Sequence, residues 1–154
     1  MKLVKMQSIS RRDAMFMIGA FSTTMLFPIG SSASTKMVSD RIKEITDGKG
    51  AEESDLFLDL PEIAENGNQV KVSFEIDSPM TKKDYVKEVH ILADGNPAPN
   101  VAKFVFSPDL GACSATTRIR LSKTQHVHLL AAYNNGKFAI TKSKVKVTIG
   151  GCGG

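Results

Sequence analysis

Val-Lys-Val-Ser-Phe-Glu-Ile, residues 70–76, alternates apolar and polar side chains without a break. A period of two places successive side chains on opposite faces of an extended chain. The stretch therefore predicts a strand with one face in a core and the other in water, which is typical of antiparallel sheets.

Similar segments recur on both sides of this strand, separated by turn signals at 65–68, 94–97, 108–111 and 134–136. The last of these contains Asn135-Gly136, a strong hairpin signal. About seven short strands, with turns about every 8–12 residues, predict an all-β, immunoglobulin-like antiparallel sandwich. We expect the strands at 56–60, 69–78, 85–93, 101–107, 116–121, 126–133 and 144–149.

A short N-terminal helix is predicted before the strands. From Lys36 to about Thr46, the apolar residues fall on one helical face, and Asp47-Gly48-Lys49-Gly50 is a stop signal. The residues of this face are Met37, Val38, Ile42 and Ile45.

Composition limits the classes of protein that the chain can represent. Its 154 residues, 42% of them apolar, suit one compact domain rather than a disordered chain, and two cysteines exclude a disulfide-dense scaffold. The net charge is +4, but residues 1–33 hold four basic residues and one acidic residue. The remainder is close to neutral, so we expect no nucleic-acid partner.

Residues 1–33 have the three parts of an export signal: a basic start, an apolar run from Ala14 to Ile29, and small residues ending at Ala33. The run is shorter than the roughly 20 apolar residues that span a membrane, so we expect no stable membrane anchor. Ser10-Arg11-Arg12-Asp13 resembles a twin-arginine signal, which exports folded proteins. An ordinary secretory signal is the alternative. Either signal predicts a periplasmic protein.

The chain ends in Gly150-Gly151-Cys152-Gly153-Gly154, here called the arm. Glycine lacks Cβ and its steric restriction, so the arm is predicted to be thin and flexible, with a reach of roughly 17 Å. The arm follows the predicted sandwich domain of residues 34–149. We interpret Cys152 as a tethered nucleophile. A disordered terminus or a structural disulfide is the alternative.

The ending Val-Thr-Ile-Gly-Gly-Cys-Gly-Gly resembles that of the SoxY family, the sulfur-carrier subunits of the periplasmic Sox thiosulfate-oxidising system. The resemblance covers nearly the whole mature chain. Besides the arm and the signal, it rests on Asn66-Gly67, Val70-Lys71-Val72, Asp77-Ser78-Pro79-Met80, Asn96-Pro97 and Thr117-Arg118-Ile119-Arg120-Leu121.

The resemblance implies that Cys152 is the covalent attachment point for thiosulfate-derived intermediates, with Gly150, Gly151, Gly153 and Gly154 supplying flexibility. It implies a non-catalytic carrier without a cofactor or a metal site. The implied partners are a SoxZ-like subunit in a heterodimer, a SoxAX-like haem cytochrome, a SoxB-like hydrolase and, in some systems, a sulfur dehydrogenase. Because SoxZ lacks its own signal, export of the folded pair would explain a twin-arginine route.

Cys113 is left over once Cys152 is assigned to function. A leftover cysteine in an exported protein suggests an intermolecular bridge, here an intersubunit disulfide with the heterodimer partner. Cys113 could instead be a free thiol, or form a resting disulfide with Cys152.

Two pairs of polar residues share strand faces. His126 and His128 have a spacing that suits two metal ligands, but no third ligand is evident and His90 is on another strand, so we interpret them as structural. Arg118 and Arg120 suit an anion or partner contact, although a solvated face is the more frequent explanation.

Two rival functions follow from the same residues. An exported structural module would use Cys152 for an intermolecular disulfide. A thiol enzyme would need a base within hydrogen-bond reach of Cys152, and a glycine arm holds no such geometry.

Overall fold

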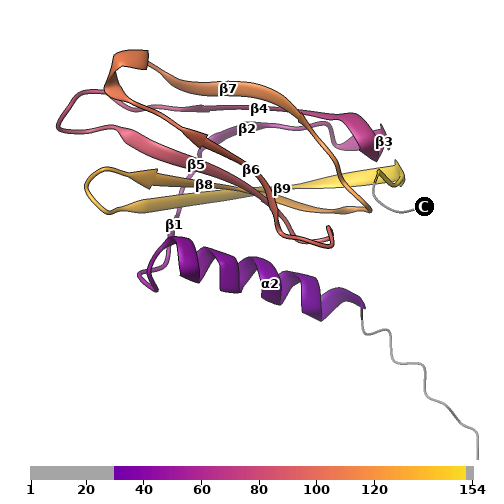
Figure 1. The fold of residues 1–154 in the computed structure, drawn as a ribbon. Coiled ribbons are helices and arrows are strands. Elements are labelled where there is room, and N and C mark those ends of the chain that lie inside the picture. Colours follow the sequence, from indigo (N-terminus) through magenta and orange to yellow (C-terminus); the bar gives the residue numbers. More distant parts are fainter. Residues whose placement is uncertain (1–29, 152–154) are drawn as a thin grey trace, which may run out of the picture.

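The computed structural model describes residues 30–151, with side chains from Thr35 onward. Two sheets pack face to face, and a helix lies on the outer face of the larger one (Figure 1). The larger sheet has the order β1 (Glu52–Glu53), β9 (Phe138–Ile149), β8 (Gln125–Tyr133), β5 (Val86–Ala93) and β6 (Asn100–Val105), and β3 (Ile63–Asn66) also pairs with β9. The smaller sheet has the order β2 (Phe57–Asp59), β4 (Val70–Ile76) and β7 (Cys113–Ile119).

The structure confirms a mostly β protein with two sheets and an N-terminal helix. Each predicted strand overlaps an observed one, and the hairpin at Asn135-Gly136 joins β8 to β9, with Gly136 at a φ of 81°. Two short strands were not predicted. β1 and β3 both pair with β9 in parallel, whereas the other pairs are antiparallel. The narrower expectation of an immunoglobulin-like architecture stays a prediction.

The core lies between the two sheets, and β4 shows why. Its alternating residues Val70, Val72, Phe74 and Ile76 are buried, while Lys71 and Glu75 are exposed. Inward-facing residues of β5 and β8 complete the core from the other sheet. Burial of these apolar side chains is the main favourable contribution to folding, at about 25 cal/mol per Å².

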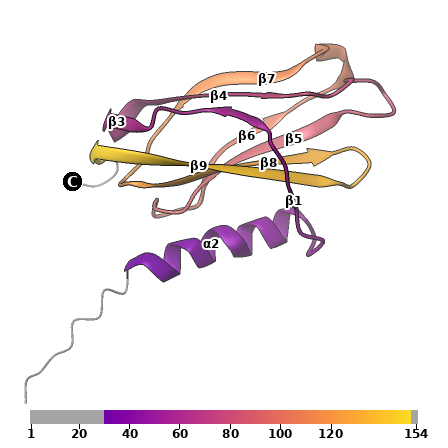
Figure 2. The ribbon, with the colours of Figure 1, turned by 180° about the vertical axis from the view of Figure 1, so that it is seen from behind.

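Helix α2 (Gly30–Ile45) covers the outer face of the larger sheet, as Figures 1 and 2 show from opposite sides. Val38 of the helix is 2% exposed. Leu92 and Leu130 are equally buried, although they alternate with the residues of β5 and β8 that face the smaller sheet. Arg41 Nε donates to Asn100 Oδ1 at 2.9 Å and joins the helix to the start of β6.

The helix is longer than predicted, because it begins at Gly30, within the predicted signal, instead of near Lys36. It ends at Ile45, followed by the predicted stop, where Gly48 has a φ of 75°. Within the described residues, no helix has the length and apolar character needed to cross a membrane.

Two 3-10 turns connect strands at the ends of the sandwich. η1 (Gly67–Gln69) leads into β4, and η2 (Pro108–Leu110) leads into β7. Gly111, which ends η2, has a φ of 69°, a left-handed conformation that favours glycine. η1 bears on the site described next, because it lies beside the root of the arm.

Candidate functional site

The arm begins where β9 ends, and the structure describes it as far as Gly151. Cys152, Gly153 and Gly154 lie outside the described residues, so the covalent role of Cys152 and the flexibility of the glycines after it stay predictions. Gly150 and Gly151 can be placed. They form the root of the arm, at the end of the sandwich where β3 runs beside the last residues of β9 (Figure 2).

Backbone hydrogen bonds tie this root to two other segments. Gly151 N donates to Leu121 O at 2.9 Å, and Leu121 N donates to Gly67 O at 2.8 Å. Three segments that are distant in sequence therefore meet: the end of the larger sheet, the residues after β7, and η1.

The glycines at this meeting point are closely packed against backbone. A Cβ added to Gly150 would overlap Ser122 O, and one added to Gly151 would overlap Gly67 O and lie 2.5 Å from Asn68 N. A Cβ on Gly67 would overlap Leu121 O. The structure therefore gives Gly150 and Gly151 a packing role that the sequence analysis did not consider.

An Asx turn holds η1 in place. Asn66 Oδ1 accepts a hydrogen bond from Asn68 N at 2.9 Å, as expected for the predicted turn signal at 65–68. Ile149, the last residue of β9, is 65% exposed beside this turn. The root of the arm thus lies next to an exposed apolar side chain.

Cys113 lies inside the core and is a free cysteine, 2% exposed at the start of β7. It pairs with Ile76 of β4. Burial raises the pKa of its thiol to about 11. The three states considered for Cys113 stay predictions, and either disulfide would require this buried thiol to become accessible.

His126 and His128 share the outer face of the larger sheet, as predicted, with ring centroids 6.5 Å apart. Asp94, which the sequence analysis treated only as part of a turn, lies beside them. Its carboxylate accepts from His126 N at 2.8 Å, and its Oδ2 lies 3.2 Å from His126 Nδ1 and 3.9 Å from His128 Nε2. The antiparallel pairing of β5 with β8 brings these residues together, a relation without any local sequence signal.

His90 is buried, whereas the side chain of His128 is 14% exposed, and the two histidines have different neighbours. His128 Nε2 is buried without a hydrogen bond to the rest of the described chain, while His90 Nε2 lies 3.1 Å from Glu88 Oε2. Burial lowers the pKa of both imidazoles, against the opposing influence of Asp94 on His128 and of Glu88 on His90. Both are neutral near pH 7, which suits a structural role.

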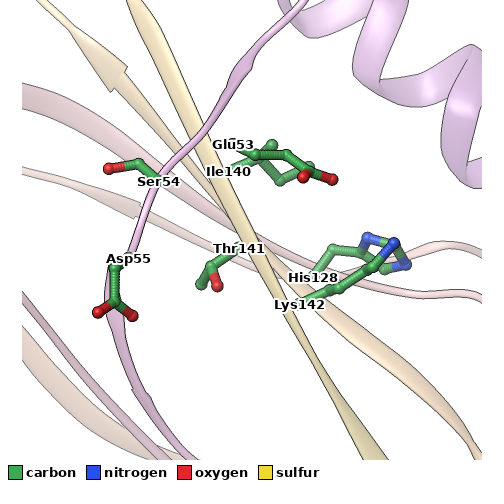
Figure 3. A pocket seen from close by; sticks show the side chains of 7 residues that line it. All are labelled: Glu53, Ser54, Asp55, His128, Ile140, Thr141 and Lys142. Atoms are coloured by element: carbon green, nitrogen blue, oxygen red, sulfur yellow. The ribbon is translucent and has the colours of Figure 1, made fainter.

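A depression of about 450 Å³ opens on this face beside β1. His128 and Lys142 line one side of it, and Figure 3 shows the carboxylate of Glu53 directed toward these two side chains and that of Asp55 directed away from them. Within residues 35–151, no three His, Cys, Asp or Glu side chains gather closely enough to hold a metal ion.

Arg118 of β7 and Arg120, which follows the end of β7, are both exposed. Arg118 stands directly opposite Lys71 of β4, and the two line a shallow depression with Thr116 and Thr117. Among the residues that the structure describes, neither arginine forms a salt bridge with a carboxylate.

Several solved structures have a fold similar to that of this chain. The structure is similar to the sulfur carrier protein SoxY from Chlorobium limicola f thiosulfatophilum, with 27% sequence identity, a TM-score of 0.63, and coverage of 74% of this chain and 94% of that one. It is also similar to a superoxide reductase (neelaredoxin) from Ignicoccus hospitalis, with 14% identity, a TM-score of 0.55, and coverage of 61% and 80%. A hypothetical protein from Pyrococcus horikoshii has 18% identity, a TM-score of 0.51, and coverage of 68% and 99%. The last two likenesses show the fold alone.

Among curated protein sequences, no relative matches the chain. The family model of the sulfur oxidation protein SoxY matches residues 26–152, which extend from the end of the predicted signal to the cysteine of the arm. With most of its length matched in this way, the chain belongs to the SoxY family of sulfur oxidation proteins.

Proposed function

We propose that this protein carries thiosulfate-derived sulfur intermediates bound covalently to Cys152 and presents them to the enzymes of sulfur oxidation. Membership of a sulfur-carrier family supports the carrier role. The single observation that supports Cys152 as the attachment point is that the family match extends to this residue, which stands among four glycines. Cys113 is a poor candidate because it is buried.

The proposed loading step is an oxidative conjugation. The thiol of Cys152 loses its proton, its sulfur forms a bond with the terminal sulfur of thiosulfate, and an electron pair leaves to an acceptor, for which a haem cytochrome is suitable. Hydrolysis then adds water across the bond to the sulfonate group, so that sulfate leaves and a persulfide stays on Cys152. A covalent tether keeps each intermediate at high effective concentration for the next enzyme.

We propose that the other chemistry belongs to partners. Members of this family are generally non-catalytic, and a glycine arm offers no base to activate the thiol. The partners proposed are a SoxZ-like subunit in a heterodimer, a SoxAX-like cytochrome and a SoxB-like hydrolase. The twin-arginine signal at Ser10-Arg11-Arg12-Asp13 supports export of the folded protein to the periplasm.

Intact mass spectrometry of the protein from cells that are oxidising thiosulfate tests the proposal. The spectra are recorded with and without reductant, and the tail peptide is then mapped. We expect sulfur or thiosulfonate adducts on Cys152 that reductant removes at least in part. A Cys152 found only unmodified, or only bridged to another protein's cysteine, would favour the structural module instead.

Matched serine variants assign the adduct to one thiol. Cys152→Ser is expected to abolish both the adduct and growth on thiosulfate, while Cys113→Ser, at the buried thiol, keeps the adduct. Loss of the adduct in Cys113→Ser, with the protein still folded, contradicts the assignment to Cys152 alone.

A further inference from the structure

The root of the arm is built into the folded body by a contact that we call the clasp. It consists of Gly67 of η1, Leu121 and Ser122 after β7, and Gly150 and Gly151 after β9. The hydrogen bonds from Gly151 N to Leu121 O and from Leu121 N to Gly67 O close it, at 2.9 and 2.8 Å. Figure 1 shows the end of β9 beside β3, the strand that leads into η1.

Space, rather than backbone conformation, requires glycine in the clasp. Gly67, Gly150 and Gly151 do not have the positive φ that disfavours other residues, in contrast with Gly111 and Gly136. What a Cβ would meet at each of the three is main chain: Leu121 O, Ser122 O and Gly67 O respectively. Main-chain atoms cannot turn away as a flexible side chain can, so an added methyl group must push the segments apart.

We propose that the clasp holds Gly150 and Gly151 as part of the folded domain, so that Cys152 is the first residue of the arm outside that domain. The inference rests on the proposed carrier function and adds the position from which the thiol is presented. The part of the arm outside the clasp then has three residues instead of five. Consecutive Cα atoms are about 3.8 Å apart, so the Cα of Cys152 stays within one peptide unit of the clasp.

This position determines which surface an enzyme must contact to reach the thiol. An arm with a mobile root could enter a distant channel, whereas a clasped arm requires the enzyme to approach this end of the sandwich. The surface there comprises η1, the exposed side chain of Ile149, and Lys123 and Thr124. The partner that fits is therefore an enzyme whose channel opening rests on these residues.

Amide hydrogen exchange on the purified protein, measured by nuclear magnetic resonance, tests the clasp without any substitution. The amide of Gly151 donates to Leu121 O, so it is expected to exchange at least about tenfold more slowly than the amides of Gly153 and Gly154. Equal rates at the three glycines would overturn the proposal.

Alanine variants separate close packing from flexibility. Gly151→Ala and Gly67→Ala are expected to lower the melting temperature by about 5 °C or more, and Gly67→Ala to speed exchange at the amide of Gly151. Gly153→Ala, which changes the same tail outside the clasp, is the control and is expected to leave the melting temperature unchanged. Similar behaviour of Gly151→Ala and Gly153→Ala would overturn the proposal.

These outcomes are independent of the carrier function. Neither measurement needs a sulfur intermediate, so a failed clasp leaves the adduct on Cys152 to be tested by mass spectrometry. Conversely, absence of the adduct would not alter the exchange rate at Gly151.

Discussion

Two effects protect the thiol of Cys113 from chemical reaction: its burial and its protonation. Only 2% of the residue is exposed, and burial raises the pKa of the thiol to about 11. Because the thiolate is the reactive form, very little of it exists at neutral pH. A cysteine in this position packs as a small apolar side chain.

Alkylation tests this protection in the variant Cys152→Ser, where Cys113 is the only cysteine. We expect iodoacetamide at neutral pH to leave the native variant unmodified and to add one label per chain in denaturant, both read by intact mass. Fast labelling of the native variant would show that β7 opens readily, and would restore the intersubunit disulfide as an alternative.

The neutral state of His128 makes folding sensitive to acid. Burial lowers the pKa of this imidazole below its ordinary value of 6.5, despite the opposing influence of Asp94, and His126 and Lys142 lower it further. Unfolding restores the ordinary pKa, so the unfolded chain binds more protons below it. The stabilisation is therefore full above a pH of about 6.5 and is lost as the pH falls towards the lower pKa of the folded state.

Urea unfolding at about pH 7.5 and about pH 5 measures this loss. We expect His128→Gln to lose less unfolding free energy between the two conditions than the wild type does. His126→Gln is the matched control, because His126 lies two residues away on the same face with a more exposed side chain. An identical loss in His128→Gln and wild type would refute the role of His128.

At the scale of elements, the alternation of apolar and polar residues was the most informative sequence signal. It predicted β4 within two residues at each end, because one face of this strand is buried and the other is in water. The first half of β9 was missed, since Phe138, Ala139 and Ile140 form an apolar run without alternation. β1 and β3 were also missed, because they are only two and four residues long and are held by parallel pairing with β9.

The smaller sheet contains a cross-strand pair that is unfavourable on its own. Lys71 and Arg118 stand directly opposite each other on its outer face, and like charges in this position destabilise a sheet. We expect Arg118→Glu to raise the free energy of unfolding by about 0.2–1 kcal/mol, because it replaces repulsion by attraction.

Urea unfolding at low and high salt checks whether the higher free energy of unfolding of Arg118→Glu comes from the charge pair. The gain should shrink as salt screens the exposed charges. Lys137→Glu makes the same change of charge in the β8–β9 turn and is the control. Equal effects of the two variants would attribute the gain to net charge rather than to the pair.

At the scale of the whole molecule, the sequence suggests a chemistry for the arm but gives no sign of how the root of the arm is attached to the domain. The glycines around Cys152 and the resemblance to the family indicated a carrier arm from local residues alone. The clasp could not be predicted in this way, because Gly67, Leu121 and Gly151 are brought together only when the two sheets close. Asp94 was missed beside His126 because the pairing of β5 with β8, which has no local sequence signal, brings the two together.

The helix extends the core to a third layer. Leu92, Leu130 and Ala132 are buried on the face of the larger sheet that points away from the smaller one, and α2 lies over that face (Figure 2). Val38 is 2% exposed, so it belongs to this layer. Cleavage after Ala33, as predicted, would leave Val38 and most of the helix in the mature protein.

The third layer predicts that alanine substitutions at two adjacent helix residues change the free energy of unfolding by different amounts. Val38→Ala removes buried methyl groups and is expected to cost about 1–3 kcal/mol of unfolding free energy. Met37→Ala, at a position that is 43% exposed, is expected to change it by less than about 0.5 kcal/mol. Both substitutions favour helix formation, so a difference between them reports packing rather than helix propensity. Urea unfolding of the two variants measures this difference, and equal stabilities would mean that the helix does not contribute a packed layer to the folded domain.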